Sequence, residues 1–216
     1  MKLKKSDLIL YAVTSSRQLN GGTLAEKVEQ AILGGATCVQ VREKNMPEEE
    51  LLKRAIEVVE ICRRYCIPVI INDSVEVALK SGADGVHLGQ SDCNVESARK
   101  LLGANKIIGV TAKTPEEAVK AQNDGADYLG TGAAFATQTK TDTYTISYED
   151  ICKIVRSVSI PVVAIGGIDE TNIMELRGSG ISGVAVVSAI FSSDNVQEST
   201  KILRGLSERL QEELYA

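Results

Sequence analysis

The 216-residue sequence contains no tryptophan and a single histidine, His87. A triad of serine, histidine and aspartate would depend on this one residue, and a metal site built from several histidines is excluded. His87 lies in the apolar segment Gly85–Leu88, where a histidine is more often a hydrogen-bonded interior residue than a catalytic base. We therefore expect a reaction that relies on positioning and charge stabilisation.

The sequence also lacks a Cys-x-x-Cys pair and a long hydrophobic run. No apolar stretch approaches the roughly 20 residues that a membrane-spanning helix needs. The basic start, Met1–Asp7, leads into an apolar segment that is too short for a signal peptide. Cys62 and Cys66 lie one helical turn apart, but no further histidine or cysteine nearby completes a metal site, so we expect reduced thiols and a cytoplasmic protein. The five cysteines are Cys38, Cys62, Cys66, Cys93 and Cys152.

Positive charge is in the minority, with 24 Lys and Arg against 29 Asp and Glu and a formal net charge of −5. This balance argues against nucleic acid or an anionic membrane as a partner, so an anionic ligand must be bound by a local cluster of cations. The composition, 44% hydrophobic and 25% charged, is typical of a globular protein. No linker divides the chain, and we expect one domain over residues 1–216. The sequence leaves open whether it forms a homo-oligomer.

Eight short apolar segments alternate with longer segments in which apolar residues recur every three or four positions. The clearest amphipathic stripe lies between Leu51 and Cys62. This alternation favours an α/β fold with a parallel sheet, and eight such units predict a single (β/α)8 TIM barrel. The predicted strands are Leu8–Thr14, Cys38–Arg42, Pro68–Asn72, Gly85–Leu88, Ile107–Thr111, Tyr128–Gly132, Pro161–Ile165 and Gly183–Ser188.

A glycine recurs in the segments that join a helix to the next strand. Glycine is the usual left-handed residue after a helix, and a nearby Asp or Thr can hydrogen-bond the local backbone. These segments therefore predict the loops at the stable end of the barrel. They begin at Gly35, Gly82, Gly125 and Gly180.

Polar side chains interrupt the second predicted strand. Gln40, Arg42 and Lys44 alternate with Val39 and Val41, so a strand would place the three polar groups on one face. A buried cation without a partner is unfavourable by several kcal/mol, and Arg42 and Lys44 should therefore meet an anion. That anion is either an internal carboxylate or a bound ligand.

Further polar groups follow other strands, where TIM barrels carry their active sites. Asp73 and Asp92 either cap the helices that follow them or hold Mg²⁺. Gly166-Gly167 and Ser188 follow the last two strands, where barrels commonly bind phosphate. The long segment from Ala133 to Ile146 is either a solvated loop or a lid whose hydroxyls and lysine contact a phosphate.

Several of these motifs, taken in order, resemble thiamine-phosphate synthase over nearly the whole chain. No single motif is specific to this family, but the six motifs in this order within a barrel pattern are. The matching segments are Tyr11–Thr14, Gln40–Asn45, Ile70–Asp73, Gly82–Gln90 with Asp92, Thr137–Lys140 and Ala164–Ile168.

The resemblance implies an Mg²⁺-dependent transferase. Such enzymes join 4-amino-2-methyl-5-hydroxymethylpyrimidine diphosphate to 4-methyl-5-hydroxyethylthiazole phosphate and release pyrophosphate. By the matching motifs, Gln40, Arg42, Lys44 and Asn72 bind the pyrimidine diphosphate, with Thr111 and Lys140 on its phosphates, and Asp73 and Asp92 hold Mg²⁺. The resemblance assigns catalysis to Arg42, Lys44, Thr111 and Lys140. It assigns binding of the thiazole phosphate to Thr137, Thr139, Gly167, Val187 and Ser188.

The chain departs from this family at two places. The usual Gly-Val-Ser-Ala-His after the fifth strand is Gly109-Val-Thr-Ala-Lys113 here, which keeps a hydroxyl at Thr111 and adds a charge at Lys113. Two prolines usual before Thr137 are absent, which should loosen the start of the lid. We expect altered kinetic constants and retained function.

Three other functions are compatible with parts of this pattern. A thiazole tautomerase of the same fold depends on a histidine where this chain has Lys113. A non-catalytic sensor of phosphate ligands is suggested only by Thr111 and Lys113. Another phosphate-binding barrel enzyme, from amino-acid biosynthesis, fits poorly with Asn72-Asp73 and with Thr137–Lys140. The sequence does not distinguish the ordinary thiazole from its carboxylated precursor as substrate.

Overall fold

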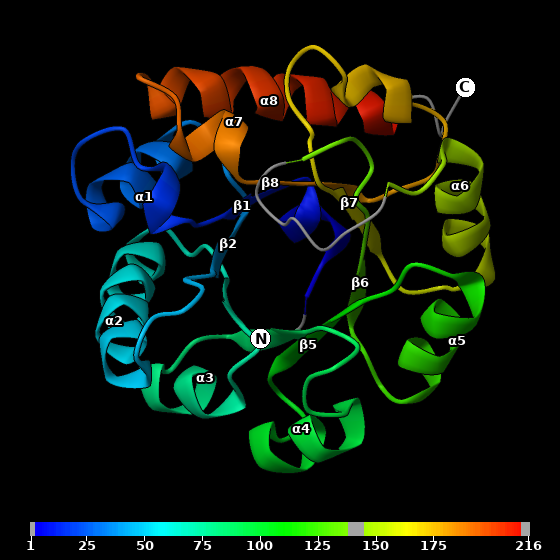
Figure 1. Ribbon diagram of the computed structural model, residues 1–216, viewed down its shortest axis with the longest axis horizontal. Coiled ribbons are helices and arrows are strands. Elements are labelled where there is room, and N and C mark those ends of the chain that lie inside the picture. The colour runs from blue at the N-terminus through cyan, green and yellow to red at the C-terminus, as the bar shows by residue number, and fades with distance from the viewer. Residues whose placement is uncertain (1–2, 138–144, 213–216) are drawn as a thin grey trace.

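Eight parallel strands form a closed barrel in the computed structural model, which describes residues 3–137 and 145–212. Each strand pairs with its neighbours in chain order, and β8 closes the barrel against β1 (Figure 1). The predicted TIM barrel is therefore confirmed. The strands are β1 Leu10–Val13, β2 Cys38–Val41, β3 Val69–Asn72, β4 Gly85–Leu88, β5 Ile107–Thr111, β6 Tyr128–Thr131, β7 Val162–Ile165 and β8 Gly183–Val186.

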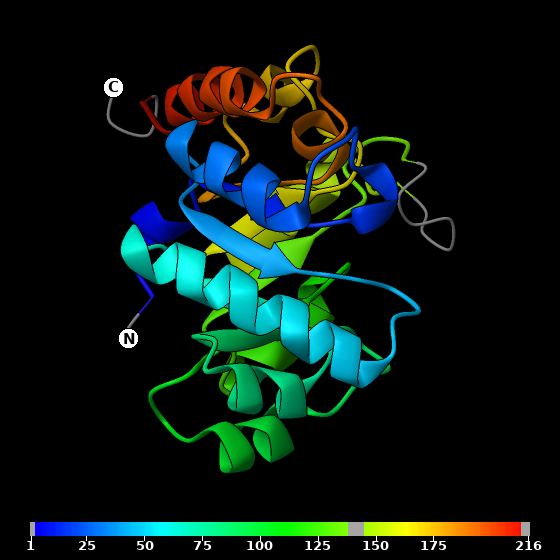
Figure 2. The same ribbon diagram turned by 90° about the vertical axis from the view of Figure 1, so that its left-hand side faces the viewer.

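Helices surround the barrel and follow the strands (Figures 1 and 2). Only a short 3-10 helix, η3 (Ile173–Leu176), follows β7. No helix in the described part of the chain is long and apolar enough to cross a membrane. The α-helices are α1 Leu24–Leu33, α2 Glu48–Arg64, α3 Val75–Ser81, α4 Val95–Leu102, α5 Pro115–Asn123, α6 Tyr148–Ser157, α7 Ser188–Phe191 and α8 Val196–Gln211.

Side-chain caps fix where most of these helices begin. Thr23 and Glu26 form a capping box at the start of α1, and Thr114 caps α5 just before Pro115. The helix α2 lacks a side-chain cap but has three glutamates in its first turn, which its dipole favours. These local signals set the lengths of the loops that surround the site.

Several predicted strands are longer than the observed ones. Two of these differences bear on the site: β8 ends at Val186, before the predicted site residues Val187 and Ser188, and β2 ends at Val41. Arg42 therefore lies, like Lys44, in the loop that follows the strand. The predicted strand end at Arg42 is wrong, and so is the placing of both cations with Gln40 on one strand face. Alternation of polar and apolar residues continues past the last strand hydrogen bond, so the pattern alone does not mark the end.

Two hydrophobic clusters divide the core between the inside and the outside of the barrel. The larger one packs the outer faces of the strands against the helices. The smaller one fills the barrel interior and includes Leu8, Tyr11, Ile107 and Tyr128. A Cβ at Gly109 would lie 2.1 Å from the ring of Tyr128, so a glycine there makes room for the tyrosine.

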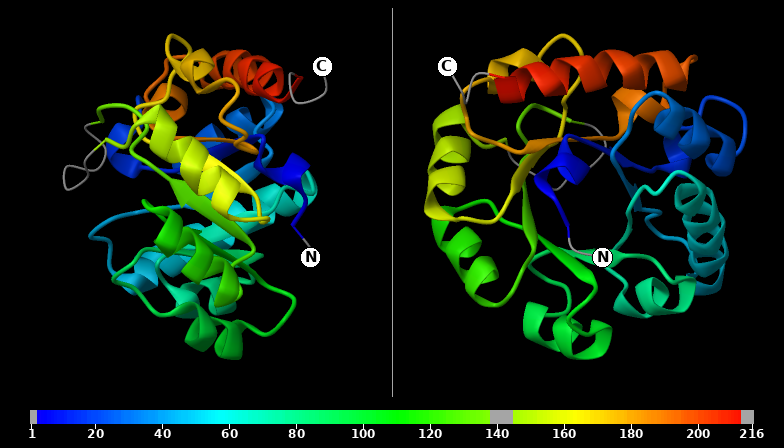
Figure 3. Two further views of the ribbon diagram at one scale, coloured as in Figure 1. Left: turned by 90° about the vertical axis from the view of Figure 1, so that its right-hand side faces the viewer. Right: turned by 180° about the vertical axis from the view of Figure 1, so that it is seen from behind.

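The N-terminal end of the barrel is closed. The 3-10 helix η1 (Lys5–Leu8) lies across it, as the view from behind in Figure 3 shows. The predicted loop glycines at this end all have positive φ values: Gly35 106°, Gly82 73°, Gly125 98° and Gly180 83°. Their left-handed conformation confirms the loop prediction.

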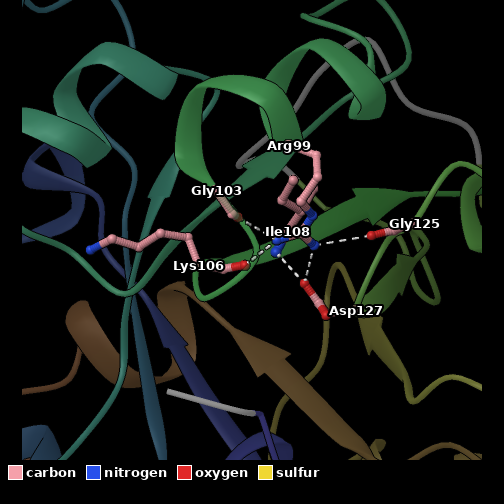
Figure 4. A network of polar contacts seen from close by, with 6 residues as sticks. All are labelled: Arg99, Gly103, Lys106, Ile108, Gly125 and Asp127. Atoms are coloured by element: carbon pink, nitrogen blue, oxygen red, sulfur yellow. Dashed lines mark hydrogen bonds and ion pairs between the residues drawn. The ribbon is translucent and has the colours of Figure 1, made fainter.

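A network around Arg99 fastens two loops at this end, the one between α4 and β5 and the one between α5 and β6 (Figure 4). The guanidinium donates to Asp127 at 2.7 Å and to the carbonyls of Gly125 at 3.1 Å and Gly103 at 3.2 Å, and also to that of Lys106. Asp127 also accepts from the Ile108 amide at 2.8 Å. Each donor in this network meets an acceptor, and the Arg99 cation meets the Asp127 carboxylate, so the network stabilises this end of the barrel.

Candidate active site

A cavity of about 660 Å³ opens at the C-terminal ends of the strands. Its volume suits a pair of small ligands. The predicted site residues that line it come from five different strands or the loops after them, so the closed barrel brings distant segments together. They are Gln40, Arg42, Lys44, Asn72, Asp73, Asp92, Thr111 and Thr137.

Arg42 and Lys44 supply the positive charge of the cavity. Burial lowers the pKa of the half-buried Arg42, and the carboxylates of Asp73 and Glu43 oppose that shift. Arg42 stays charged at neutral pH because the delocalised guanidinium of arginine keeps its proton in proteins. Lys44 is exposed, and its charge lowers the pKa of Asp73. The expected internal carboxylates are present, but Arg42 and Lys44 also face open space.

Asp73 and Asp92 form a pair of carboxyl groups beside these cations. Although Asp73 is exposed at the cavity mouth, surrounding atoms remove part of its hydration, and this burial is the largest cause that raises its pKa to about 6. The hydrogen bond and charge of Asp92 raise it further, while Arg42 and Lys44 lower it. Two acidic groups held this close fit a divalent cation, which would relieve their repulsion.

The described residues contain no cluster of three or more histidine, cysteine, aspartate or glutamate side chains with metal-site spacing. A cation at Asp73 and Asp92 would therefore take its other ligands from a substrate and from water, as Mg²⁺ often does. The donor set, two carboxylates and no nitrogen or sulfur, suits a hard cation.

The alternative that these aspartates cap helices is wrong. Ser74 caps α3 by accepting from the Val77 amide, and Asn94 caps α4. Asp73 precedes this cap residue and has a φ of 64°, a left-handed conformation that few non-glycine residues adopt. Asp92 accepts instead from the amide of Gly89 at 2.7 Å, which holds its carboxyl in the loop after β4.

Thr111 and Lys113 lie at the end of β5. The Lys113 amide donates to Glu117 at 2.7 Å, and both residues line the cavity. The hydroxyl of Thr111 lies 3.0 Å from Nε2 of His87. His87 itself is an interior residue, since its Nδ1 lies 3.0 Å from the Tyr128 hydroxyl, and it also lines the cavity. Its predicted role as a hydrogen-bonded barrel residue is confirmed.

Three predicted residues at the ends of β7 and β8 do not line this cavity. Gly167 has a φ of 66°, and a Cβ there would lie 2.4 Å from the Ala136 carbonyl oxygen, so it packs against the loop after β6. Val187 packs on the interior cluster, and Ser188 is the exposed first residue of α7. Gly166, next to them, does line the cavity. Thr139 and Lys140 lie outside the described residues.

Glu43 has a role that the sequence analysis missed. Its carboxylate accepts from the Thr14 hydroxyl at 2.8 Å and from the Ser16 amide at 2.9 Å, while Thr14 accepts from the Arg42 amide at 3.0 Å. These bonds tie the loop that carries Arg42 to the loop after β1. The alternation that places Arg42 and Lys44 on one side places Glu43 on the other, and that signal could have found it.

Comparison with known proteins identifies the family. The family model described as thiamine monophosphate synthase matches residues 10–190. The thiamine-phosphate synthase of Ruminiclostridium cellulolyticum is 50% identical over 92% of this chain and 95% of its own length. That of Clostridium tetani is 45% identical over 95% and 98%.

A solved structure agrees with these relatives. Thiamine phosphate pyrophosphorylase from Pyrococcus furiosus superposes with a TM-score of 0.87 at 40% identity, and the match covers 95% of this chain and 98% of that one. The family model and the relatives name the same family, and the superposition agrees with the closed barrel. The chain belongs to the thiamine-phosphate synthase family.

Proposed function

We propose that this cavity joins 4-amino-2-methyl-5-hydroxymethylpyrimidine diphosphate to 4-methyl-5-hydroxyethylthiazole phosphate, with release of pyrophosphate, in the cytoplasm. The observation that carries the site assignment is the convergence of Arg42, Lys44, Asp73 and Asp92 at one mouth of the barrel. Cations beside a carboxylate pair suit a diphosphate that arrives with a divalent metal ion. Both partners of the reaction are small molecules that a cavity of about 660 Å³ can hold.

Leaving-group stabilisation is the main task of the protein in this reaction. When the bond between the pyrimidine methylene and the diphosphate oxygen breaks, negative charge grows on the departing pyrophosphate. Arg42 and Lys44 face that charge from the loop after β2, and Thr111 donates a hydrogen bond to it. Lys140 acts on the same group. Fixed charges in a partly dehydrated site act more strongly than the same charges in water.

Asp73 and Asp92 are the residues that would hold Mg²⁺. The bound cation supplies charge neutralisation at the diphosphate oxygens. Arg42 and Lys44 complement the acidic pair, because their charges lower the pKa of Asp73 and keep it ionised for this role at neutral pH.

The thiazole nitrogen is the nucleophile, and it carries no proton that must be removed. The protein therefore has to hold the thiazole phosphate beside the pyrimidine methylene, which is a proximity effect. Thr137 lines the cavity and serves this purpose together with Thr139. Gly167, Val187 and Ser188 do not line the cavity, and we assign them to the phosphate end of the thiazole substrate, beyond the cavity wall. Gln40 and Asn72 orient the pyrimidine ring. The absence of a second histidine is consistent with a reaction that needs no general base.

Pyrophosphate release tests the proposal. The purified protein is assayed with both substrates and Mg²⁺, and each of the three components is omitted in turn. Release that needs all three, with thiamine phosphate as the second product, supports the reaction. Proton exchange on the thiazole without the pyrimidine would instead indicate a tautomerase, and binding of both substrates without release would indicate a sensor.

A further inference from the structure

A chain of hydrogen bonds crosses the interior of the barrel and links two residues of the proposed site. The amide nitrogen of Gln40 lies 2.9 Å from the Tyr11 hydroxyl, and the Tyr11 and Tyr128 hydroxyls lie 2.9 Å apart. Tyr128 reaches Nδ1 of His87 at 3.0 Å, and Nε2 of His87 reaches the Thr111 hydroxyl at 3.0 Å. Each link joins side chains from different strands.

The middle of this chain is shielded from water. Tyr11 is 1% exposed, Tyr128 is 0% exposed and Gln40 is 4% exposed. Burial raises the pKa of both tyrosines well above its ordinary value, so both hydroxyls keep their protons. Because each hydroxyl has only one proton to donate, the donor and acceptor in one hydrogen bond of the chain determine the donor and acceptor in the next.

The ligand sets that direction, and this step rests on the proposed function. Phosphate oxygens only accept, so Thr111 must point its proton at the diphosphate and accept from His87. His87 then carries its proton on Nε2 and accepts at Nδ1 from Tyr128. Tyr128 in turn accepts from Tyr11, and Tyr11 accepts from the amide nitrogen of Gln40. The observed orientation of Gln40 has this direction.

One orientation of Gln40 then faces the pyrimidine. The amide presents its carbonyl oxygen as an acceptor and its second N–H as a donor. A ring with an amino group next to an unprotonated nitrogen offers the matching donor and acceptor. A ring with an oxo group next to an N–H offers the reverse, and Gln40 could match it only by rotating its amide, which breaks the bond to Tyr11 or reverses the whole chain.

We propose that His87, Tyr128 and Tyr11 are positioning residues that hold Gln40 in one amide orientation and so select the 4-aminopyrimidine over its 4-oxo counterpart. None of the three needs to exchange a proton during the reaction. The selection comes from the direction of hydrogen bonds that run from the diphosphate end of the cavity to its pyrimidine end.

The tautomer of His87 is the first test. Because the chain has one histidine, the nitrogen NMR spectrum of histidine-labelled protein without an affinity tag reports this ring alone. With inorganic pyrophosphate and Mg²⁺ bound at neutral pH, we expect a neutral ring with its proton on Nε2. A proton on Nδ1, or a doubly protonated ring, would overturn the proposal. Pyrophosphate binding is followed separately by phosphorus NMR, so a failure to bind counts against the proposed function instead.

Selectivity is the second test. Inhibition constants are measured for 4-amino and 4-oxo pyrimidines whose diphosphate is attached through a non-cleavable phosphonate carbon, so that differences in reactivity play no part. We expect Tyr11→Phe to reduce the ratio of the 4-oxo to the 4-amino constant about tenfold, with the KM for thiazole phosphate unchanged. Tyr128→Phe should do the same and should also mix the two His87 tautomers.

A surface tyrosine provides the matched control. The Tyr65 hydroxyl donates to Glu29 at 2.8 Å on the outer surface, and Tyr65→Phe should leave the ratio and the tautomer unchanged. A wild-type ratio in both Tyr11→Phe and Tyr128→Phe, with turnover intact, would overturn the inference and leave the proposed function standing. If either variant fails to fold, the tautomer measurement on the wild-type protein still decides.

Discussion

The two ends of the barrel differ in how their charged groups are arranged. At the N-terminal end, Arg99 meets Asp127 and three carbonyl oxygens, so that attraction dominates. At the C-terminal end, Asp73 and Asp92 lie together and repel each other, and Asp73 also adopts a left-handed backbone conformation. Strain and repulsion of this kind occur where a ligand relieves them. The difference supports the proposed division, in which the closed end stabilises the fold and the open end is arranged for binding.

The strongest test of this comparison is Asp73→Asn, which removes the repulsion and keeps a residue that tolerates positive φ. We expect turnover with Mg²⁺ to fall by about a thousandfold, equivalent to about 4 kcal/mol, because the proposed metal ligand is lost. Steady-state pyrophosphate release measures this effect. A fully active variant would remove Asp73 from the metal site.

The same variant should be slightly more stable than the wild type, and the sign depends on pH. A carboxyl whose pKa is raised to about 6 binds a proton more readily in the folded state, so wild-type stability falls as pH rises from about 4 to 6. Asp73→Asn should lack this loss, with a gain near 0.5 kcal/mol above pH 6 because solvent screens an exposed group. Urea unfolding at pH 4.5 and pH 7.5 measures the difference.

The matching test at the closed end is Arg99→Ala. It removes the donors of several loop carbonyls and the partner of Asp127, so we expect a loss of about 2 kcal/mol in the free energy of unfolding. The kcat of the folded variant should stay within about twofold of wild type, since the network lies at the other end of the barrel. Arg64→Ala is the control, because its ion pair with Glu29 at 3.3 Å is exposed and worth less than about 1 kcal/mol.

A smaller effect is expected at the boundary of the open end, where Glu43 ties the Arg42 loop to the loop after β1. Glu43→Gln keeps an acceptor for Thr14 but loses the charge that strengthens both bonds, so we expect a roughly tenfold higher KM for the pyrimidine diphosphate. Thr14→Ser keeps the hydroxyl and should behave as wild type, whereas Thr14→Val should resemble Glu43→Gln. An unchanged KM in both Glu43→Gln and Thr14→Val would show that the tie does not position Arg42.

What the sequence predicted depends on how local the signal is. The loop glycines and most strand positions follow from short-range patterns, and they were found. The caps at Ser74 and Asn94 are also local, but Asp73 and Asp92 are equally good capping residues by type, and only the backbone geometry separates them. The chain from Gln40 to Thr111 includes a contact between residues 117 positions apart, which no sequence pattern specifies. Barrel closure creates it.

The last prediction concerns Thr131, the final residue of β6 at the open end of the barrel. Its hydroxyl is the one buried side-chain polar atom without a hydrogen-bond partner among the described residues, and the side chain is 0% exposed. Thr131 does not line the cavity, so this defect differs from the repulsion at Asp73 in having no ligand to relieve it. Thr131→Val replaces the hydroxyl with a methyl group of similar size and should raise the free energy of unfolding by about 1 kcal/mol. Thr131→Ser, which keeps the hydroxyl, should show no such gain in urea unfolding. Unchanged kcat and KM in Thr131→Val would show that this buried hydroxyl serves only the stability of the fold, whereas a change in either constant would show that it also supports the cavity that its neighbours Gly130 and Gly132 line.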